Sequence, residues 1–134
     1  MVTREDFESY LIRMDLDYEE VDEGMYLVRG RNTGLPMVAH YSAPLLLLRM
    51  KLMDLPAGGD GEKLGLFRTL LELNATDVVH GAYGIENNEL ILSDTLELET
   101  LDFLELQASM ESMEMAATGH MERLRTLAGV QGEG

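Results

Sequence analysis

The chain has 134 residues and no cysteine, and its 25 acidic against 10 basic residues give a formal net charge of −15. This length fits one domain, and the missing cysteines exclude disulfides and thiolate metal sites, which favours a reducing cytoplasm. The acidity argues against binding to nucleic acid or to anionic membranes, because both attract clustered Lys and Arg. No apolar run approaches the roughly 20 residues that span a bilayer, and residues 1–9 are too charged for a signal peptide.

The N-terminal segment predicts a helix followed by a turn. Thr3 with Asp6 forms an N-terminal capping pair, and apolar residues at helical spacing follow it over residues 4–16. The acidic run at residues 15–23 lacks the Gly and the Glu that an EF-hand calcium loop needs at its sixth and twelfth positions. We therefore expect this run to be a solvated turn that binds no metal.

The middle of the chain predicts three strands of an antiparallel meander. Residues 25–29, 36–41 and 45–52 are rich in apolar and β-branched or aromatic residues, and residues 31–34 between the first two read as a turn. A glycine-rich loop at residues 56–61 follows. It lacks the Gly-Lys-Ser/Thr end of a phosphate-binding loop, so we expect no bound nucleotide.

The second half predicts two helices around a hairpin. Residues 62–73 carry a helical leucine stripe that Asn74 is expected to stop. Strands at 80–86 and 89–94 flank an Asn-Asn turn, and residues 100–128 form a long helix.

The resulting order, α-β-β-β-α-β-β-α, predicts an α+β fold. Adjacent strands between helices favour one antiparallel sheet of about five strands, with the helices mainly on one face. We expect a single domain over residues 1–129 and a flexible tail at 130–134.

No catalytic constellation is visible, and we predict neither an enzyme nor a cofactor. The histidines His40, His80 and His120 do not fall at the close spacing of a zinc pair. His120 lies in the apolar stripe of the long helix, where a hydrogen-bonded structural role is expected. No serine has the context of a nucleophile elbow.

The long helix carries two apolar stripes. The first is continuous and should pack on the sheet; it comprises Phe103, Leu106, Met110, Met113, Ala117, His120, Leu124 and Leu127. The second is partial, comprising Leu101, Leu104, Ala108 and Met115, and part of this band is a candidate contact with a partner. The chain has 10 methionines, and methionine is common where binding must be adaptable.

Strand alternation also predicts a binding surface on the outer face of the sheet. It places Leu45, Leu47, Arg49 and Lys51 on one side, away from the helices. Met25, Leu27 and Arg29 of the first strand can join them if the register agrees. The segment 24–59 has 4 basic and 1 acidic residue, so this face would be apolar and basic within an acidic protein. The alternative is that a loop, the tail or a second copy covers it.

Several segments resemble a known family. They are Ser42-Ala43-Pro44-Leu45-Leu46-Leu47-Leu48-Arg49, Leu70-Leu71-Glu72-Leu73-Asn74, His80-Gly81-Ala82-Tyr83-Gly84-Ile85, Leu90-Ile91-Leu92, and Leu96-Glu97-Leu98 with Leu101. Together with the element order they resemble the bacterial YbjN family and are similar to CesT-type type III secretion chaperones, which share its fold. The resemblance implies a bacterial, cytoplasmic, usually dimeric protein, and it offers no catalytic residues to carry over.

The leading functional hypothesis is a non-catalytic chaperone-like or adaptor domain that holds a peptide or protein partner. Its predicted contacts are Leu45, Leu47, Arg49, Lys51, Met25, Leu27 and Arg29. The alternative is a regulatory dimer that docks onto a folded signalling or stress-response protein, and a small enzyme of unknown reaction is a third possibility. We expect a homodimer with no nucleic-acid or membrane partner.

Overall fold

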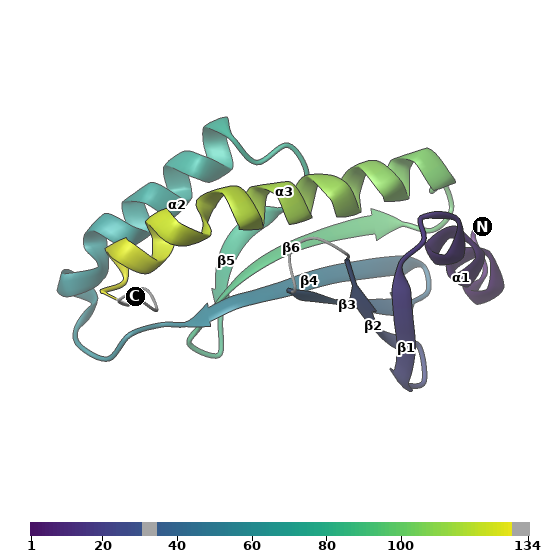
Figure 1. Ribbon diagram of the computed structural model, residues 1–134, viewed down its shortest axis with the longest axis horizontal. Helices are drawn as coiled ribbons and strands as arrows, with labels where there is room; N and C mark the ends of the chain where they lie inside the picture. Colours follow the sequence, from purple (N-terminus) through teal and green to yellow (C-terminus); the bar gives the residue numbers. More distant parts are fainter. Residues whose placement is uncertain (31–34, 130–134) are drawn as a thin grey trace.

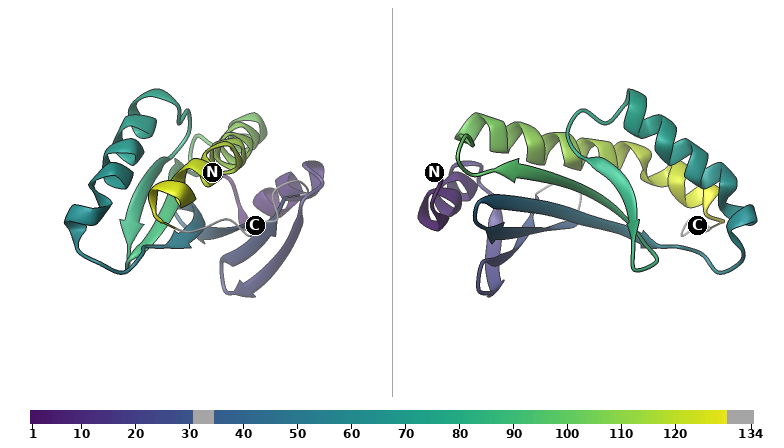
Figure 2. Two further views of the ribbon diagram at one scale, coloured as in Figure 1. Left: turned by 60° about the vertical axis from the view of Figure 1, so that its left-hand side comes forward. Right: turned by 180° about the vertical axis from the view of Figure 1, so that it is seen from behind.

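Three α-helices lie on one face of a six-stranded antiparallel sheet (Figures 1 and 2). The computed structural model describes residues 1–30 and 35–129, so the predicted turn at 31–34 and the predicted tail at 130–134 lie outside the described residues. The strand order is β1-β2-β3-β4-β6-β5. The α+β class and the antiparallel sheet are therefore confirmed.

The elements have the following bounds. The strands are β1 (Asp17–Asp22), β2 (Met25–Arg29), β3 (Pro36–Ser42), β4 (Leu45–Asp54), β5 (Ala82–Glu86) and β6 (Glu89–Glu97). The helices are α1 (Arg4–Arg13), a short 3-10 helix η1 (Asp60–Lys63), α2 (Leu64–Thr76) and α3 (Phe103–Leu127).

Strand β1 corrects the prediction of a solvated acidic turn and raises the strand count to six. It pairs with β2 through a tight hairpin in which Gly24 has φ +73°. Tyr18 faces the helices, where its ring lies 6.1 Å from the ring of Tyr26. Because β1 is an edge strand, its other side chains remain in water, and charges there discourage pairing with another sheet. The acidic residues made this segment look like a turn, although the pairing with β2 and the inward ring of Tyr18 stabilise a strand.

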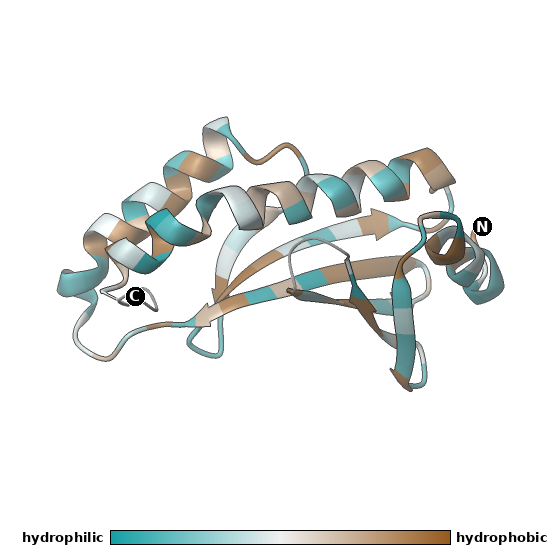
Figure 3. Cartoon of the chain, viewed as in Figure 1, coloured by the Kyte–Doolittle hydropathy of each residue, from teal (hydrophilic) through white to brown (hydrophobic). Residues whose placement is uncertain are grey.

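The core lies between the helices and the inner face of the sheet. Alternate residues of β2, β3 and β4 point inward and are buried. In β4 the hydropathy colours alternate after the four leucines at residues 45–48 (Figure 3). In α1, Phe7 is fully buried and meets Tyr26 edge-on, with ring centroids 5.1 Å apart. In α3, the first predicted stripe supplies Leu106 and Met113 to the same core. The positions of the apolar residues within each helical or strand repeat, which the sequence shows, thus decide which face is buried.

Helices α1 and α3 each begin at a side-chain cap, of which the one at Thr3 was predicted. Thr3 accepts a hydrogen bond from the Asp6 N–H, and the Asp6 carboxylate accepts one from the Thr3 N–H, both at 3.0 Å. Asp102 accepts the Glu105 N–H at 2.8 Å, so α3 begins at Phe103. Each contact satisfies an N–H group that has no partner within the helix.

Asn74 has a different role from the predicted helix stop. Helix α2 continues past Asn74 to Thr76. The Asn74 side chain instead binds the backbone of β5. The Asn74 amide nitrogen donates to the Tyr83 carbonyl at 3.2 Å, and its oxygen accepts the Tyr83 N–H at 2.7 Å. Because these Tyr83 groups lie on the unpaired side of β5, the side chain replaces a neighbouring strand at that position.

Replacing Asn74 with Ala is expected to lower the free energy of unfolding by about 1–3 kcal/mol, because two backbone groups of Tyr83 lose their partner. Urea unfolding followed by circular dichroism measures this loss. The matched control is Ala75→Gly, next to Asn74 but without such contacts, which should cost about 1 kcal/mol through helix propensity alone. Because Ala is the better helix former, an Asn74→Ala variant that loses no stability would show that the amide contributes nothing.

Candidate functional site

The seven predicted contact residues share the outer face of the sheet. Cross-strand partners in an antiparallel sheet point to the same face. One row runs Met25, His40, Leu47 and Thr95, and the next runs Leu27, Val38, Arg49 and Ser93. Leu45 lies at one end of these rows, and Arg29 and Lys51 lie at the other. The register that the sequence left open therefore agrees with the prediction.

The apolar residues of this face are half-buried although all three helices pack on the opposite side (Figure 2). This holds for Met25, Leu27, Leu45 and Leu47 alike. Val38 and His40 of β3 lie between them and belong to the same surface. The prediction did not name these two residues, although the alternation of the strand predicted over 36–41 would have placed them there. We call Met25, Leu27, Val38, His40, Leu45 and Leu47 the outer apolar face.

Two cations at the edge of this face, Arg49 and Lys51, have carboxylate partners. Arg49 pairs with Glu86 at 2.9 Å, and Lys51 pairs with Asp54 at 2.9 Å and with Glu89 at 3.0 Å. The hairpin between β5 and β6 supplies two of these carboxylates, Glu86 and Glu89. Their position beside β4 could not be predicted from the sequence. The hydrogen bonds to Asp54 and Glu89 raise the pKa of Lys51. The face is therefore apolar with a paired polar border, and less basic than its own strands suggest.

A second apolar surface, which the sequence analysis did not name, lies on α2 and β5. Leu64 and Leu71 are 64% and 70% exposed, and with Phe67 and Ala75 they line a shallow groove along α2. Ile85, on the neighbouring edge strand β5, is 50% exposed. The sequence does indicate this surface, because the apolar band on α2 is wider than the single stripe that a helix buries against the core. We call Leu64, Phe67, Leu71, Ala75 and Ile85 the α2–β5 patch.

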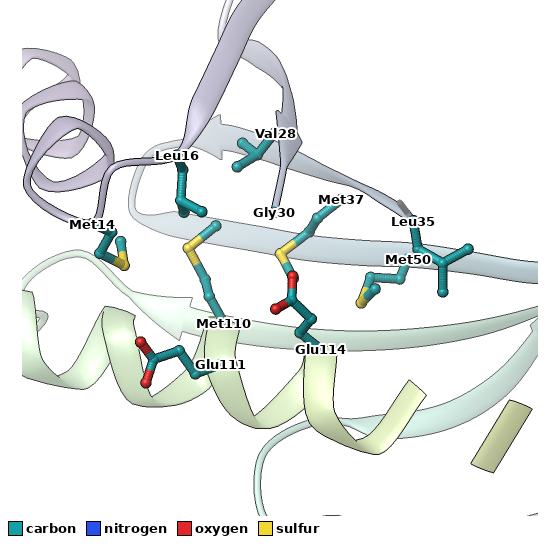
Figure 4. A pocket seen from close by; sticks show the side chains of 10 residues that line it. All are labelled: Met14, Leu16, Val28, Gly30, Leu35, Met37, Met50, Met110, Glu111 and Glu114. Carbon is teal, nitrogen blue, oxygen red and sulfur yellow. The ribbon is translucent and has the colours of Figure 1, made fainter. Parts of the chain in front are cut away.

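A pocket of about 160 Å³ opens between α3 and the inner face of β2 and β3 (Figure 4). Its apolar lining comprises Met14, Leu16, Val28, Leu35, Met37, Met50 and Met110. Glu111 and Glu114 of α3 also line it. A side chain at Gly30 would collide with the Glu114 carboxylate, so glycine lets that carboxylate lie against the end of β2. This pocket could not be predicted from the sequence, because five separate segments contribute to it. We call it the methionine pocket.

His120 is held by hydrogen bonds on both ring nitrogens. Its Nδ1 lies 2.7 Å from the Tyr83 hydroxyl, and its Nε2 lies 3.3 Å from the Asp77 carboxylate. If Tyr83 donates to Nδ1, the ring proton is on Nε2 and faces Asp77. The structural role predicted for His120 is thereby confirmed, and α3, α2 and β5 are tied together at one point.

Burial raises the pKa of Tyr83 to about 12, and the nearby Asp77 carboxylate adds to the shift. The folded protein therefore keeps this proton at pH values where the unfolded chain, with a pKa near 10, releases it. Stability from this group is fully present below about pH 10 and is lost as the pH rises towards about 12. We expect the wild type to lose roughly 1–2 kcal/mol more than Tyr83→Phe between about pH 9 and pH 11.5.

Urea midpoints of the two proteins at both pH values measure this difference, with Tyr10→Phe as the matched control. Equal losses in the wild type and in Tyr83→Phe would contradict the prediction.

The described residues, 1–30 and 35–129, contain no group of three His, Asp or Glu side chains that could hold a metal ion. Within the same ranges, no helix is long and apolar enough to cross a membrane.

Comparison with known proteins gives one family. The profile of the family described as CesT_Tir_1 matches residues 2–129. No curated protein matches the chain.

Several solved structures share the fold. A chain of the heterodimeric ExoU–SpcU complex of the Pseudomonas aeruginosa type III secretion system has a TM-score of 0.66 at 16% identity, covering 89% of this chain and 94% of that chain. YbjN from E. coli has a TM-score of 0.66 at 12% identity, with coverages of 92% and 94%. The structure of the Yersinia pestis type III secretion chaperone SycH with a fragment of YscM2 has a TM-score of 0.58 at 13% identity, with coverages of 84% and 93%. At these identities the likeness establishes the fold alone.

Proposed function

Because the chain belongs to the CesT_Tir_1 family, whose profile matches residues 2–129, we propose that it is a non-catalytic, chaperone-like protein of the bacterial cytoplasm. It holds an extended segment of a protein partner on the outer apolar face. The similar structures include a secretion chaperone with a fragment of its partner, which supports a protein-binding role. The partner's identity is a matter for experiment.

The observation that carries this proposal is the continuous apolar surface on the side of the sheet without helices. Met25, Leu27 and Val38 lie beside Leu47 across three strands, and no described helix packs on them. A contiguous apolar surface of this kind marks a contact site in a soluble protein. A bound segment would bury this surface, which contributes about 25 cal/mol per Å² before the costs of ordering are subtracted.

The border of the face would select the partner. Arg49 and Lys51 already contact carboxylates of the β5–β6 hairpin, so a partner's acidic side chain would have to compete with Glu86 or Glu89 for them. The outer apolar face therefore supplies the affinity, and the paired border disfavours a strongly charged segment, which would have to break these ion pairs.

We also propose that the chain is a homodimer formed through the α2–β5 patch. A twofold axis would place the leucine stripe of α2 against the same stripe of the partner. It would also set Arg68 of one copy near Glu72 of the other; within one copy these side chains already pair at 3.4 Å. A patch with its own complementary charges suits the self-matching contact of a twofold dimer.

The alternative is a regulatory dimer that docks onto a folded partner. It has the same dimer interface as the leading proposal, but it binds a folded protein surface and not an extended segment. An extended segment binds as an isolated peptide, whereas a folded partner loses binding when it is cut into peptides. The third reading, a small enzyme, is not proposed, because the family relationship favours a binding role.

Photo-crosslinking in the native cell tests the function. A photoreactive residue at position 47 is expected to yield a reproducible adduct with one protein, identified by mass spectrometry. The same residue at Ile12, which is 64% exposed on α1, is the matched control. Peptides tiled across the captured protein then separate an extended segment from a folded surface. Identical adduct patterns at the two positions would reject the outer face as the site.

A further inference from the structure

We infer that the methionine pocket is a second binding site, which takes a large apolar side chain of a peptide adjacent to Lys or Arg. The pocket lies on the helix side of the sheet, so it is separate from the outer apolar face. The inference rests on the proposed function only in taking the occupant to be a protein segment.

The size of the pocket fits one large side chain. Its volume is about 160 Å³. An engineered apolar cavity of about 150 Å³ in another protein stays free of water and binds benzene, so a space of this size accepts an aromatic ring. Val28 and Met50 form its floor and are buried, while Met14 and Leu16 are half-buried where the chain passes from α1 to β1.

The lining favours an aromatic or long aliphatic occupant. Met14, Met37, Met50 and Met110 converge on the pocket from four different elements or connections (Figure 4). The methionine side chain is flexible and polarisable, and its sulfur makes favourable contacts with aromatic rings. Such a lining adapts to several apolar side chains, which suits a site that recognises a class of residue.

The carboxylates add a charge preference. Glu114 is half-buried and held against Gly30, and Glu111 is exposed one turn earlier on α3. No described cation pairs with either carboxylate. A cationic residue next to the apolar anchor would meet both, whereas an acidic residue there would be repelled.

Methionine methyl NMR tests the site directly. In protein labelled at the methionine methyl groups, the peptide Ser-Gly-Phe-Lys-Gly-Ser is expected to shift the signals of Met14, Met37, Met50 and Met110 in a saturable way. Met115, which is 75% exposed on α3, serves as the internal control. A peptide with Glu in place of Lys should bind up to about fivefold more weakly, as befits a partly exposed charge pair. A peptide with Ser in place of Phe should not bind.

Two variants separate the charge from the cavity. Glu114→Lys should reverse the preference between the Lys and Glu peptides, and Glu122→Lys, the same change at an exposed position of α3, should not. If Glu114→Lys loses the dispersed methyl spectrum of a folded protein, Glu111→Lys at the exposed position replaces it. Leu47→Asp should leave the response of the pocket unchanged, so failure of the outer face and failure of the pocket are distinguishable. Absence of a saturable shift, shifts confined to Met25, or equal affinities for the two peptides would overturn the inference.

Discussion

Replacing Leu47 with Asp is expected to weaken binding of the crosslinked partner by at least about thirtyfold, the loss of about 2 kcal/mol that defines a binding hot spot. Leu47 lies at the centre of the outer apolar face, between His40 and Thr95 of the neighbouring strands. A carboxylate there would have to be desolvated under the bound segment without a matching donor. In the free protein it remains in contact with water and close to His40, so the fold should survive.

Calorimetry with the captured segment measures the affinity, and circular dichroism with light scattering checks the fold and the oligomeric state. Ile12→Asp is the matched control, because it places the same carboxylate at an exposed apolar position, on α1. If Leu47→Asp unfolds or dissociates the protein, the outer face is buried by a second copy or by another part of the chain. If affinity is unchanged in a folded protein, the face is not the binding site.

Replacing Leu71 with Asp is expected to convert the proposed homodimer into a monomer. Leu71 is 70% exposed and central to the α2–β5 patch, so a carboxylate there costs little within one chain but would face its own copy across the twofold axis. Light scattering should report 15.0 kDa for the variant and twice this mass for the wild type at high micromolar concentration.

A charge exchange provides the sharper control for this dimer. Arg68→Glu alone should weaken association by up to about fivefold, because two repulsive pairs replace two attractive ones at the surface. Adding Glu72→Arg should restore it, since the exchanged pair is again complementary in both copies. A wild-type mass of 15.0 kDa, or no effect of Leu71→Asp, would contradict the proposed dimer.

The sequence by itself determined the local structure wherever one signal dominated. The cap at Thr3, the helical period of α3 and the alternation along β4 are each set by neighbours within a few residues, and the structure bears them out. The inward and outward sets of β4 were predictable for the same reason, because successive side chains of a strand must point to opposite faces. The segments that resemble the family added the expectation of its α+β fold.

Only the tertiary structure decided the features that depend on distant partners. Strand β1 forms because β2 completes its hydrogen bonds, although four acidic residues obscure the pattern. Asn74 binds the edge of β5, and the β5–β6 hairpin neutralises Arg49 and Lys51. The methionine pocket joins α1, β2, β3, β4 and α3 with their connections. Local periodicity fixes which way a side chain points within its own element, whereas the packing of elements fixes what it meets, and the binding surfaces depend on both.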